Sequence, residues 1–379
     1  MEKILIVTKD IAEFNNYQSV ADKLTNRYNI FIVAEGLSLE RWQQKRWPIS
    51  LFPSFIVGSP SLYEKSTLMR SDISPRNTIN MLRPDLIMTG LASPINLGEE
   101  FGLAANEAGI PLGYIEDLWG VHTRSKAKPD FVCTVDAYGA SLVEKYYNGK
   151  TKCFVTGAPS DDILLGVEAH PEVEAVVKKT PYTVLVAGQD HSTTPLLAGL
   201  LSFLEGRGNY TIIPRFHPKW LAVTEETVAA ETDPVKKKTA EGIFSACNQW
   251  RSMLGAVKNG TVWWAPSHIT THQITKSVPY VVSIYSNVLR EAGILGAVPV
   301  SWTSDIGREM MQKHMGGLER YPLVQYGAVI EVETPKDYLR CVPNPDTPEY
   351  RATRAIIKQQ LRTDGKNTER VVQAIEQYL

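Results

Sequence analysis

Short runs of apolar, mostly β-branched residues alternate with amphipathic stretches along almost the whole chain. In the first half, Asn16–Tyr28 and Leu97–Ala108 have the spacing of amphipathic helices. The apolar runs between such stretches predict strands at Ile4–Thr8, Ile30–Ala34, Ser54–Val57, Leu86–Thr89, Leu112–Ile115, Phe131–Val135 and Cys153–Thr156. Continuously apolar strands separated by helices are typical of a parallel sheet covered on both faces.

The second half repeats this alternation. Its predicted strands are Thr183–Ala187, Tyr210–Arg215, Val262–Trp264, Tyr280–Tyr285, Ala297–Trp302 and Ala328–Val332. The charged segment Gly166–Pro181 lies between the two series, and we expect it to be a weakly structured connection. Two helical patterns, Pro348–Leu361 and Asn367–Leu379, follow the last strand.

This pattern predicts an α/β protein with two tandem Rossmann-like, doubly wound parallel-sheet domains facing a cleft. A length of 379 residues also favours two domains over one. Ligands of such sheets bind beyond the carboxyl ends of the strands. We therefore expect the active site between the domains.

The segment Ser277–Trp302 is the most informative, because it predicts a strand, a polar turn, a helix and a second strand. The turn Ser286-Asn287 would place a helix N-terminus beyond the first strand, where backbone N–H groups and the helix dipole suit a phosphate. Glu291, one turn into the helix, can then reach a ribose hydroxyl. The alternative is an ordinary βαβ unit in which Ser286 only caps the helix.

Two further predicted strand ends carry groups that suit a phosphate. Gly188 follows one strand and permits close approach of a ligand to the backbone, and the hydroxyl-rich turn 192–194 can cap a helix or bind phosphate. The other strand leads into Arg215, His217 and Lys219, whose charges can neutralise a diphosphate. Alternatively, these charges belong to a solvated polar loop. Three such strand ends together favour a phosphate site.

In the first half, the sequence GIPLGYIEDLWGVHTR predicts a strand followed by Glu116, Asp117 and His122. Carboxylates and an imidazole at a strand end are what a general base requires, because their pKa values can be tuned towards neutrality. The alternative is that Asp117 caps a loop that Trp119 anchors to the core. The first loop, Lys9–Glu13, is a second candidate for the floor of the cleft.

Several common signatures are absent. No glycine-rich fingerprint follows the first strand, Glu144 stands where a P-loop preceding Gly149-Lys150-Thr151 requires glycine, and there is no GxSxG or Asp-x-Asp motif. His268 and His272 are spaced like the ligands of a zinc helix, but HITTH lacks the glutamate of HExxH. The sequence therefore predicts neither a metal nor a cofactor.

Composition narrows the cellular setting. The formal net charge of −1 gives no basic field for nucleic acid or an anionic membrane. Four dispersed cysteines without CxxC spacing fit a reducing compartment. The first residues predict a strand rather than a signal peptide, and no apolar run approaches about 18 residues, so we expect no transmembrane segment and a cytoplasmic protein.

These motifs, taken together, resemble those of a known fold. GIPLGYIEDLW, PDFVCTVD and KCFVTGAPSDDIL, then VLVAGQD, IIPRFHPKW and SIYSNVLREAGILGAVPV, resemble the blocks of GT-B glycosyltransferases in the same order. The block order is most similar to lipid-A-disaccharide synthase and to the UDP-N-acetylglucosamine 2-epimerases of that fold. The phosphate turn of these proteins often has glycine where this chain has Asn287.

The resemblance implies an N-terminal acceptor domain, residues 1–165 with the closing helix 362–379, and a nucleotide-sugar-binding domain, residues 166–361. It implies ribose contact by Glu291. The phosphate contacts it implies are made by Gly188, His217, Ser286, Asn287 and Val288.

The reaction favoured by the sequence is metal-independent transfer of a sugar from a nucleoside-diphosphate sugar, most simply a UDP-sugar. The acceptor is unidentified and can be a glycan, a lipid, a small molecule or a modified nucleic acid, and the oligomeric state is open. An inverting enzyme would use Asp117, Glu116 or His122 as base. The alternatives are a nucleotide-sugar 2-epimerase with the same donor pocket and an inactive nucleotide-sugar-binding protein.

Overall fold

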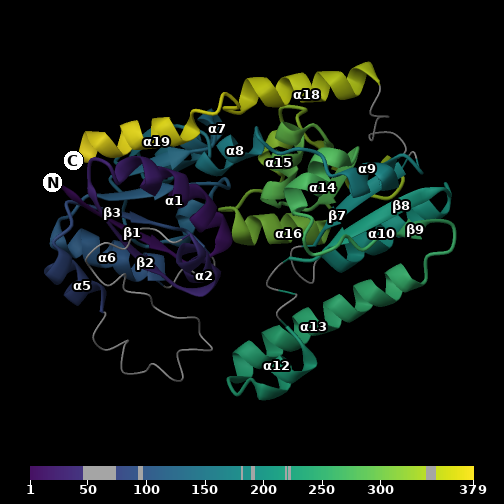
Figure 1. Ribbon diagram of the computed structural model, residues 1–379, viewed down its shortest axis with the longest axis horizontal. Helices are drawn as coiled ribbons and strands as arrows, with labels where there is room; N and C mark the ends of the chain where they lie inside the picture. Colours follow the sequence, from purple (N-terminus) through teal and green to yellow (C-terminus); the bar gives the residue numbers. More distant parts are fainter. Residues whose placement is uncertain are drawn as a thin grey trace. The chain divides into compact units, whose positions relative to one another are not determined.

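The computed structural model describes residues 1–45, 74–92, 97–180, 182–188, 193–217, 220, 223–338 and 347–379 (Figure 1). These residues form two compact units. Unit 1 comprises Met1–Ile163, His314–Gly316 and Leu361–Leu379, and unit 2 comprises Leu164–Lys313 and Gly317–Gln360. The predicted strand Ser54–Val57 and the predicted phosphate contact Lys219 lie outside the described residues.

The sheet of unit 1 contains six strands in the order β2-β1-β3-β4-β5-β6, and all neighbours are parallel. The strands are β1 (Lys3–Thr8), β2 (Asn29–Ala34), β3 (Leu86–Thr89), β4 (Leu112–Ile115), β5 (Phe131–Thr134) and β6 (Lys152–Val155). Ile4, Leu5 and Ile6 are fully buried because helices cover both faces of the sheet. This explains why the strands read as continuously apolar.

Helices of unit 1 form two cores, one on each face of its sheet. They are α1 (Ile11–Leu24), α2 (Gly36–Gln44), α5 (Pro75–Leu82), α6 (Leu97–Ala108), η1 (Val121–Arg124), α7 (Ala137–Tyr146), α8 (Pro159–Leu164), α19 (Asn367–Ile375) and η3 (Glu376–Tyr378). The predicted bounds of α6 are confirmed. The predicted helix Asn16–Tyr28 is corrected, because Asp10 and Glu13 form a capping box that starts α1 at Ile11.

Unit 2 has a second parallel sheet of six strands, in the order β12-β11-β10-β7-β8-β9. The strands are β7 (Tyr182–Ala187), β8 (Tyr210–Arg215), β9 (Thr261–Val262), β10 (Tyr280–Ser283), β11 (Val298–Trp302) and β12 (Ile330–Val332). Each predicted strand that falls within the described residues is confirmed, with ends that differ by at most two residues.

Helices of unit 2 alternate with its strands. They are α9 (Pro171–Val177), α10 (Thr193–Glu205), α12 (Glu225–Ala230), α13 (Pro234–Gly255), α14 (Thr271–Ser277), α15 (Asn287–Leu295), α16 (Asp305–His314), η2 (Pro322–Val324) and α18 (Pro348–Gln360). The expectation that Gly166–Pro181 is weakly structured is wrong. This segment contains α9, and the side chain of Val173 is fully buried in the core with Ile274 and Val281.

The carboxyl-terminal helix α19 belongs to unit 1 and lies beside α1 (Figure 1). Its buried face includes Val371 and Ile375, which join the core that contains α1. Among the described helices, none is both long and apolar enough to cross a membrane.

Candidate functional site

The three strand ends that the sequence singled out belong to adjacent strands of unit 2. β7 lies between β10 and β8, and all three run parallel, so their carboxyl ends share one edge of the sheet. β8, the next strand in the sequence, lies on one side of β7, and β10 lies on the other side. This makes the β7–β10 boundary a topological switch point, where doubly wound sheets bind ligands. The Ser283 hydroxyl donates a hydrogen bond to the Ala187 carbonyl at 3.0 Å and links these two strand ends.

The N-terminus of α15 lies directly beyond β10. Ser286 is its N-cap, and the Ser286 hydroxyl accepts a hydrogen bond from the Val288 N–H at 3.3 Å. The Tyr321 hydroxyl donates to the Ser286 carbonyl at 3.4 Å and holds the turn from the other side. Ser286 and Asn287 are half-buried, whereas Val288 is buried. The cap is confirmed, and it leaves the positive end of the helix dipole at the sheet edge.

Glu291 faces His272 of α14 across this edge. The Glu291 Oε2 and His272 Nε2 atoms are 3.3 Å apart, with side chains that are 18% and 34% exposed. Burial raises the pKa of Glu291, but the hydrogen bond and charge of His272, together with the charge of Arg290, outweigh it and hold that pKa below its ordinary value. Glu291 is therefore an ionised hydrogen-bond acceptor held next to an imidazole.

Arg215, at the end of β8, is tied to the segment that starts α14. Its guanidinium donates to the Ile269 carbonyl at 3.0 Å and to the Thr271 hydroxyl at 3.2 Å. Partial burial lowers the pKa of Arg215, which still leaves a cation at the sheet edge. The predicted contact His217 follows two residues later and is half-buried.

Gly188 has a packing role in the structure. Its N–H donates to the Arg215 carbonyl at 2.9 Å, and an added Cβ would lie 3.2 Å from the Trp250 ring. A glycine is therefore favoured at this position by close packing against an aromatic ring. The Gly188 N–H is already used in the hydrogen bond between the β7 and β8 strand ends, so it is not available to a phosphate in this structure.

In unit 1, Glu116 and His122 form a buried pair beyond β4. Glu116 Oε1 accepts the His122 backbone N–H at 2.9 Å and lies 2.7 Å from the imidazole Nδ1. Each side chain is 1% exposed. Glu116 Oε2 has no hydrogen-bond partner within the part of the chain that the structure describes. The adjacent Asp117 is half-buried, so it is the most accessible of the three predicted catalytic residues.

Glu13 occupies the corresponding switch point of unit 1, between β1 and β3. Its carboxylate accepts backbone N–H groups from Lys9 at 2.5 Å, Ala92 at 2.6 Å and Asp10 at 3.3 Å. Burial raises the pKa of Glu13 to about 8, with a further contribution from Asp10, and the three N–H donors only partly oppose this. A cavity of ≈ 10 Å³, room for about one water, adjoins Glu13, Gly90 and Ala92.

The acidic groups of unit 1 thus follow neighbouring strands, because β1, β3 and β4 are adjacent in the sheet. Glu13 lies at the ends of β1 and β3, and Glu116 and Asp117 follow β4. This edge offers one carboxyl group whose pKa lies near neutrality and a second that is paired with an imidazole. Both of these groups are buried, so the half-buried Asp117 is the acid at this edge that is open to proton exchange with a bound molecule.

Sequence reasoning missed the pairing of His272 with Glu291. It grouped His272 with His268 as a possible metal pair, yet His268 lies outside α14, and His272 is in its first turn. The missed signal is the capping box Thr270–Gln273, which starts α14 between the two histidines.

No protein-family model matches the chain, and no curated protein matches it. Several solved structures, however, are similar to the structure of this chain. A Staphylococcus aureus MnaA–UDP structure has a TM-score of 0.66 and 13% identity, covering 100% of this chain and 97% of that chain. The Methanocaldococcus jannaschii UDP-GlcNAc 2-epimerase with UDP-GlcNAc and UDP has a TM-score of 0.64 and 13% identity, covering 99% of each chain. Acinetobacter baumannii MurG has a TM-score of 0.58 and 14% identity, covering 100% of each chain.

This chain has the GT-B fold. The predicted α/β architecture with two doubly wound parallel sheets is therefore confirmed. Identities of 12–14% establish the fold alone, so the reaction has to be argued from the site.

Proposed function

We propose that this chain is an enzyme that binds a UDP-sugar, with the diphosphate at the β10-β7-β8 edge of unit 2. Three features at this one edge of the sheet support the proposal most strongly. These are the N-terminus of α15, the cation of Arg215, and the ionised Glu291 beside His272. A helix N-terminus and a cation suit a diphosphate, and a carboxylate suits ribose hydroxyls. Similar folds were solved with UDP or UDP-GlcNAc bound.

We further propose that the reaction is epimerisation at C2 of a UDP-GlcNAc-type sugar. Several similar structures are UDP-GlcNAc 2-epimerases, including those from Methanocaldococcus jannaschii and Neisseria meningitidis. Inversion of a carbon that carries hydrogen needs groups that remove a proton and return one to the opposite face. We assign one of these transfers to Asp117, the half-buried carboxyl group at the unit 1 edge, and the reaction needs no acceptor.

Within this proposal the residues of unit 1 have different roles. Asp117 is half-buried, and we assign to it the proton transfer with the sugar. Glu116 and His122 are buried and bonded to each other, so they act as a positioning pair for the loop that carries Asp117. Glu13 would affect the electrostatic potential at the neighbouring strand ends. Its cavity has room for about one water.

Glycosyl transfer is the second candidate, and the similarity to MurG over the whole chain favours it. Transfer would use the same diphosphate site, with Asp117 as the base that deprotonates an acceptor hydroxyl. The α15 dipole and Arg215 would stabilise the leaving diphosphate in place of a metal ion.

Product analysis separates these reactions. The protein is incubated with UDP-GlcNAc and no acceptor, and the sugar nucleotides are followed by proton NMR. We expect a second UDP-N-acetylhexosamine, and we expect Asp117→Asn to lower its rate at least about 100-fold. Glu107→Gln, an exposed acid in unit 1 that pairs with Arg76, is the control and should leave the rate unchanged.

Release of UDP only after an acceptor is added would overturn epimerisation in favour of transfer. Binding of UDP without any product from UDP-GlcNAc, with or without an acceptor, would indicate a nucleotide-sugar-binding protein. Absence of UDP binding would overturn the proposal as a whole.

A further inference from the structure

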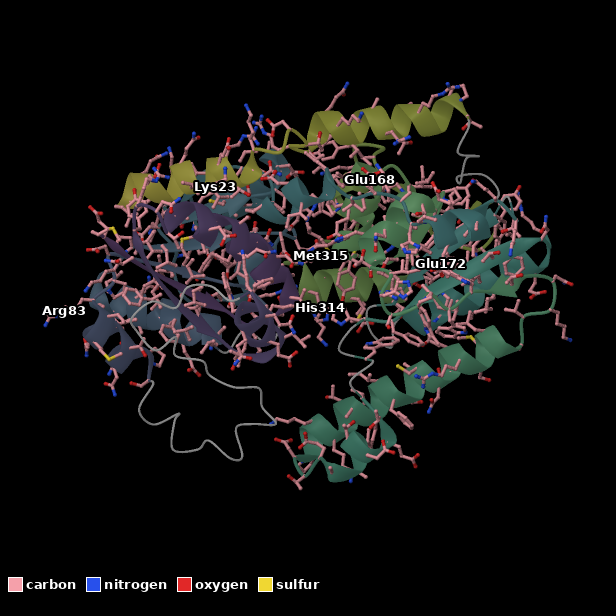
Figure 2. All side chains as sticks on the ribbon, in the orientation of Figure 1. Lys23, Arg83, Glu168, Glu172, His314 and Met315 are labelled. Carbon is pink, nitrogen blue, oxygen red and sulfur yellow. The ribbon has the colours of Figure 1, made fainter. Side chains whose placement is uncertain are left out.

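Unit 2 gathers three metal-ligating side chains away from the Glu291–His272 pair. They are His170, Glu172 and His268, and each offers one ligand atom, all within 4.8 Å of one another. His268 Nε2 is 3.6 Å from Glu172 Oε1, and the imidazole centroids of His170 and His268 are 5.8 Å apart. Figure 2 marks Glu172 among the side chains of α9. The residues come from segments almost 100 positions apart, so the fold alone assembles them.

The backbone around this cluster is firmly held. His170 is the N-cap of α9, and its own N–H donates to the Ser277 hydroxyl at 3.0 Å. Val173, one turn along α9, is fully buried. His268 precedes Ile269, whose side chain is also fully buried. The backbone is therefore fixed by the core, whereas the side chains of Glu172 and His268 are 54% and 64% exposed and reach solvent.

We propose that His170, Glu172 and His268 bind a divalent transition metal ion of the Zn²⁺ class. Two imidazoles and one carboxylate form a nitrogen and oxygen ligand set that suits Zn²⁺, Ni²⁺ or Cu²⁺, and that is a poor match for Mg²⁺ or Ca²⁺. A tetrahedral zinc site needs ligand atoms about 3.3 Å apart, a spacing that rotation of exposed side chains reaches from 4.8 Å. A water completes the coordination.

The hydrogen bonding of His170 suits this role. Its Nδ1 accepts the Glu172 backbone N–H at 3.3 Å, so Nδ1 carries an electron pair and no proton. A metal bound through Nδ1 replaces one long hydrogen bond and requires no change of tautomer. A bound ion would fasten α9 to the segment that ends in Ile269, whose carbonyl accepts a hydrogen bond from Arg215.

Zinc titration by calorimetry on the full-length, untagged protein, after dialysis against EDTA, tests the site. We expect one zinc per chain and no heat with Mg²⁺. Glu172→Gln and His268→Ala should each weaken zinc binding at least about tenfold, because each removes one of three ligands. Glu174→Gln is the matched control, since Glu174 is an exposed acid on the same helix outside the cluster, and it should bind zinc like the wild type.

Cobalt supplies an independent readout, because four-coordinate Co²⁺ absorbs in the visible range far more strongly than the hexaaqua ion. The wild type should develop these bands at one equivalent, and Glu172→Gln should not, while circular dichroism shows both to be folded. Equal zinc affinity in Glu172→Gln and Glu174→Gln would mean an adventitious ion only and would overturn the site. Neither measurement uses substrate, so this result is independent of the proposed reaction.

Discussion

Gly90 lies so close to a carboxylate that a side chain has no room there. A Cβ at this position would fall 2.0 Å from the Glu13 carboxylate. We expect Gly90→Ala to lower the free energy of unfolding by about 1–3 kcal/mol, because the carboxylate must leave its three backbone donors. Urea denaturation measures the change. The effect should shrink in the double variant with Glu13→Ala, since that change removes the clash.

Gly242, in the middle of α13, is the matched control. An added Cβ there meets nothing within 4 Å, so Gly242→Ala should stabilise the chain by about 0.5–1 kcal/mol. Equal destabilisation by both substitutions would contradict the role assigned to the Glu13 carboxylate.

The raised pKa of Glu13, about 8, has a consequence for stability. An unfolded glutamate has a pKa of about 4.3. Between these values the folded chain retains a proton that the unfolded chain has lost. The free energy of unfolding therefore falls as pH rises, by at most about 1.4 kcal/mol per pH unit, and is level below and above this window.

Glu13→Gln removes this titration. Urea denaturation at intervals from pH 5 to pH 8 should show a steeper decline for the wild type than for the variant. Parallel curves for the two proteins would show that Glu13 keeps an ordinary pKa.

The proposed contact between Glu291 and the ribose can be tested with a single substitution. Glu291→Gln keeps the shape of the side chain but removes the charge next to His272, so we expect the Kd for UDP to rise about 5- to 30-fold. Calorimetry measures the change. Glu319→Gln, an exposed acid in unit 2, should leave the Kd unchanged, and a similar Kd for both variants would contradict ribose contact by Glu291.

The sequence identified residues better than it identified their partners. The position of Ser286 between an apolar strand and an amphipathic run predicts that it caps a helix, and the structure confirms this prediction. The burial of Glu116 and His122 against each other could not be predicted, because it depends on the turn through η1. The hydrogen bond from the Ala92 N–H to the Glu13 carboxylate could not be predicted either, because the two residues are 79 positions apart in the sequence and meet only in the folded sheet.

Among the elements, α19 is fastened by a carboxylate from another part of unit 1. Asp162 accepts hydrogen bonds from the backbone N–H groups of Asn367 at 3.1 Å and Thr368 at 2.8 Å. A carboxylate at a helix N-terminus also interacts favourably with the helix dipole. We expect Asp162→Ala to lower the free energy of unfolding by about 1–2 kcal/mol.

Thermal or urea denaturation tests this expectation. Asp22→Asn is the control, because it removes an exposed carboxylate of unit 1 that pairs with Lys45 and should change stability by less than about 0.5 kcal/mol. An equally small effect at Asp162 would show that α19 is held by its apolar face alone.

The elements with strong periodicity were predictable, and the short charged ones were not. α6 has the predicted bounds because its apolar residues recur at helical spacing from end to end. α9 was mistaken for a connection, because a helix of 7 residues with a single fully buried side chain has too few apolar positions to show a period. Its signal was local, in Pro171 after a capping residue.

At the scale of the whole molecule, the alternation of strands and helices predicted two parallel sheets, and the observed strand orders confirm the architecture. The order of strands within each sheet could not be predicted, since apolar strands of similar length do not specify their neighbours. That order is what brings Ala187, Arg215 and Ser283 to adjacent strand ends in unit 2. The proposed diphosphate site therefore rests on topology as much as on residue type.

We propose that a nucleoside diphosphate binds at this edge of unit 2, and hydrogen–deuterium exchange with and without UDP locates that binding on the chain. We expect slower exchange in peptides that cover residues 182–188, 210–217 and 271–291, with α12 unchanged as an internal control. Unchanged exchange in all three peptides at saturating UDP, or protection confined to Met1–Ile163, would contradict it.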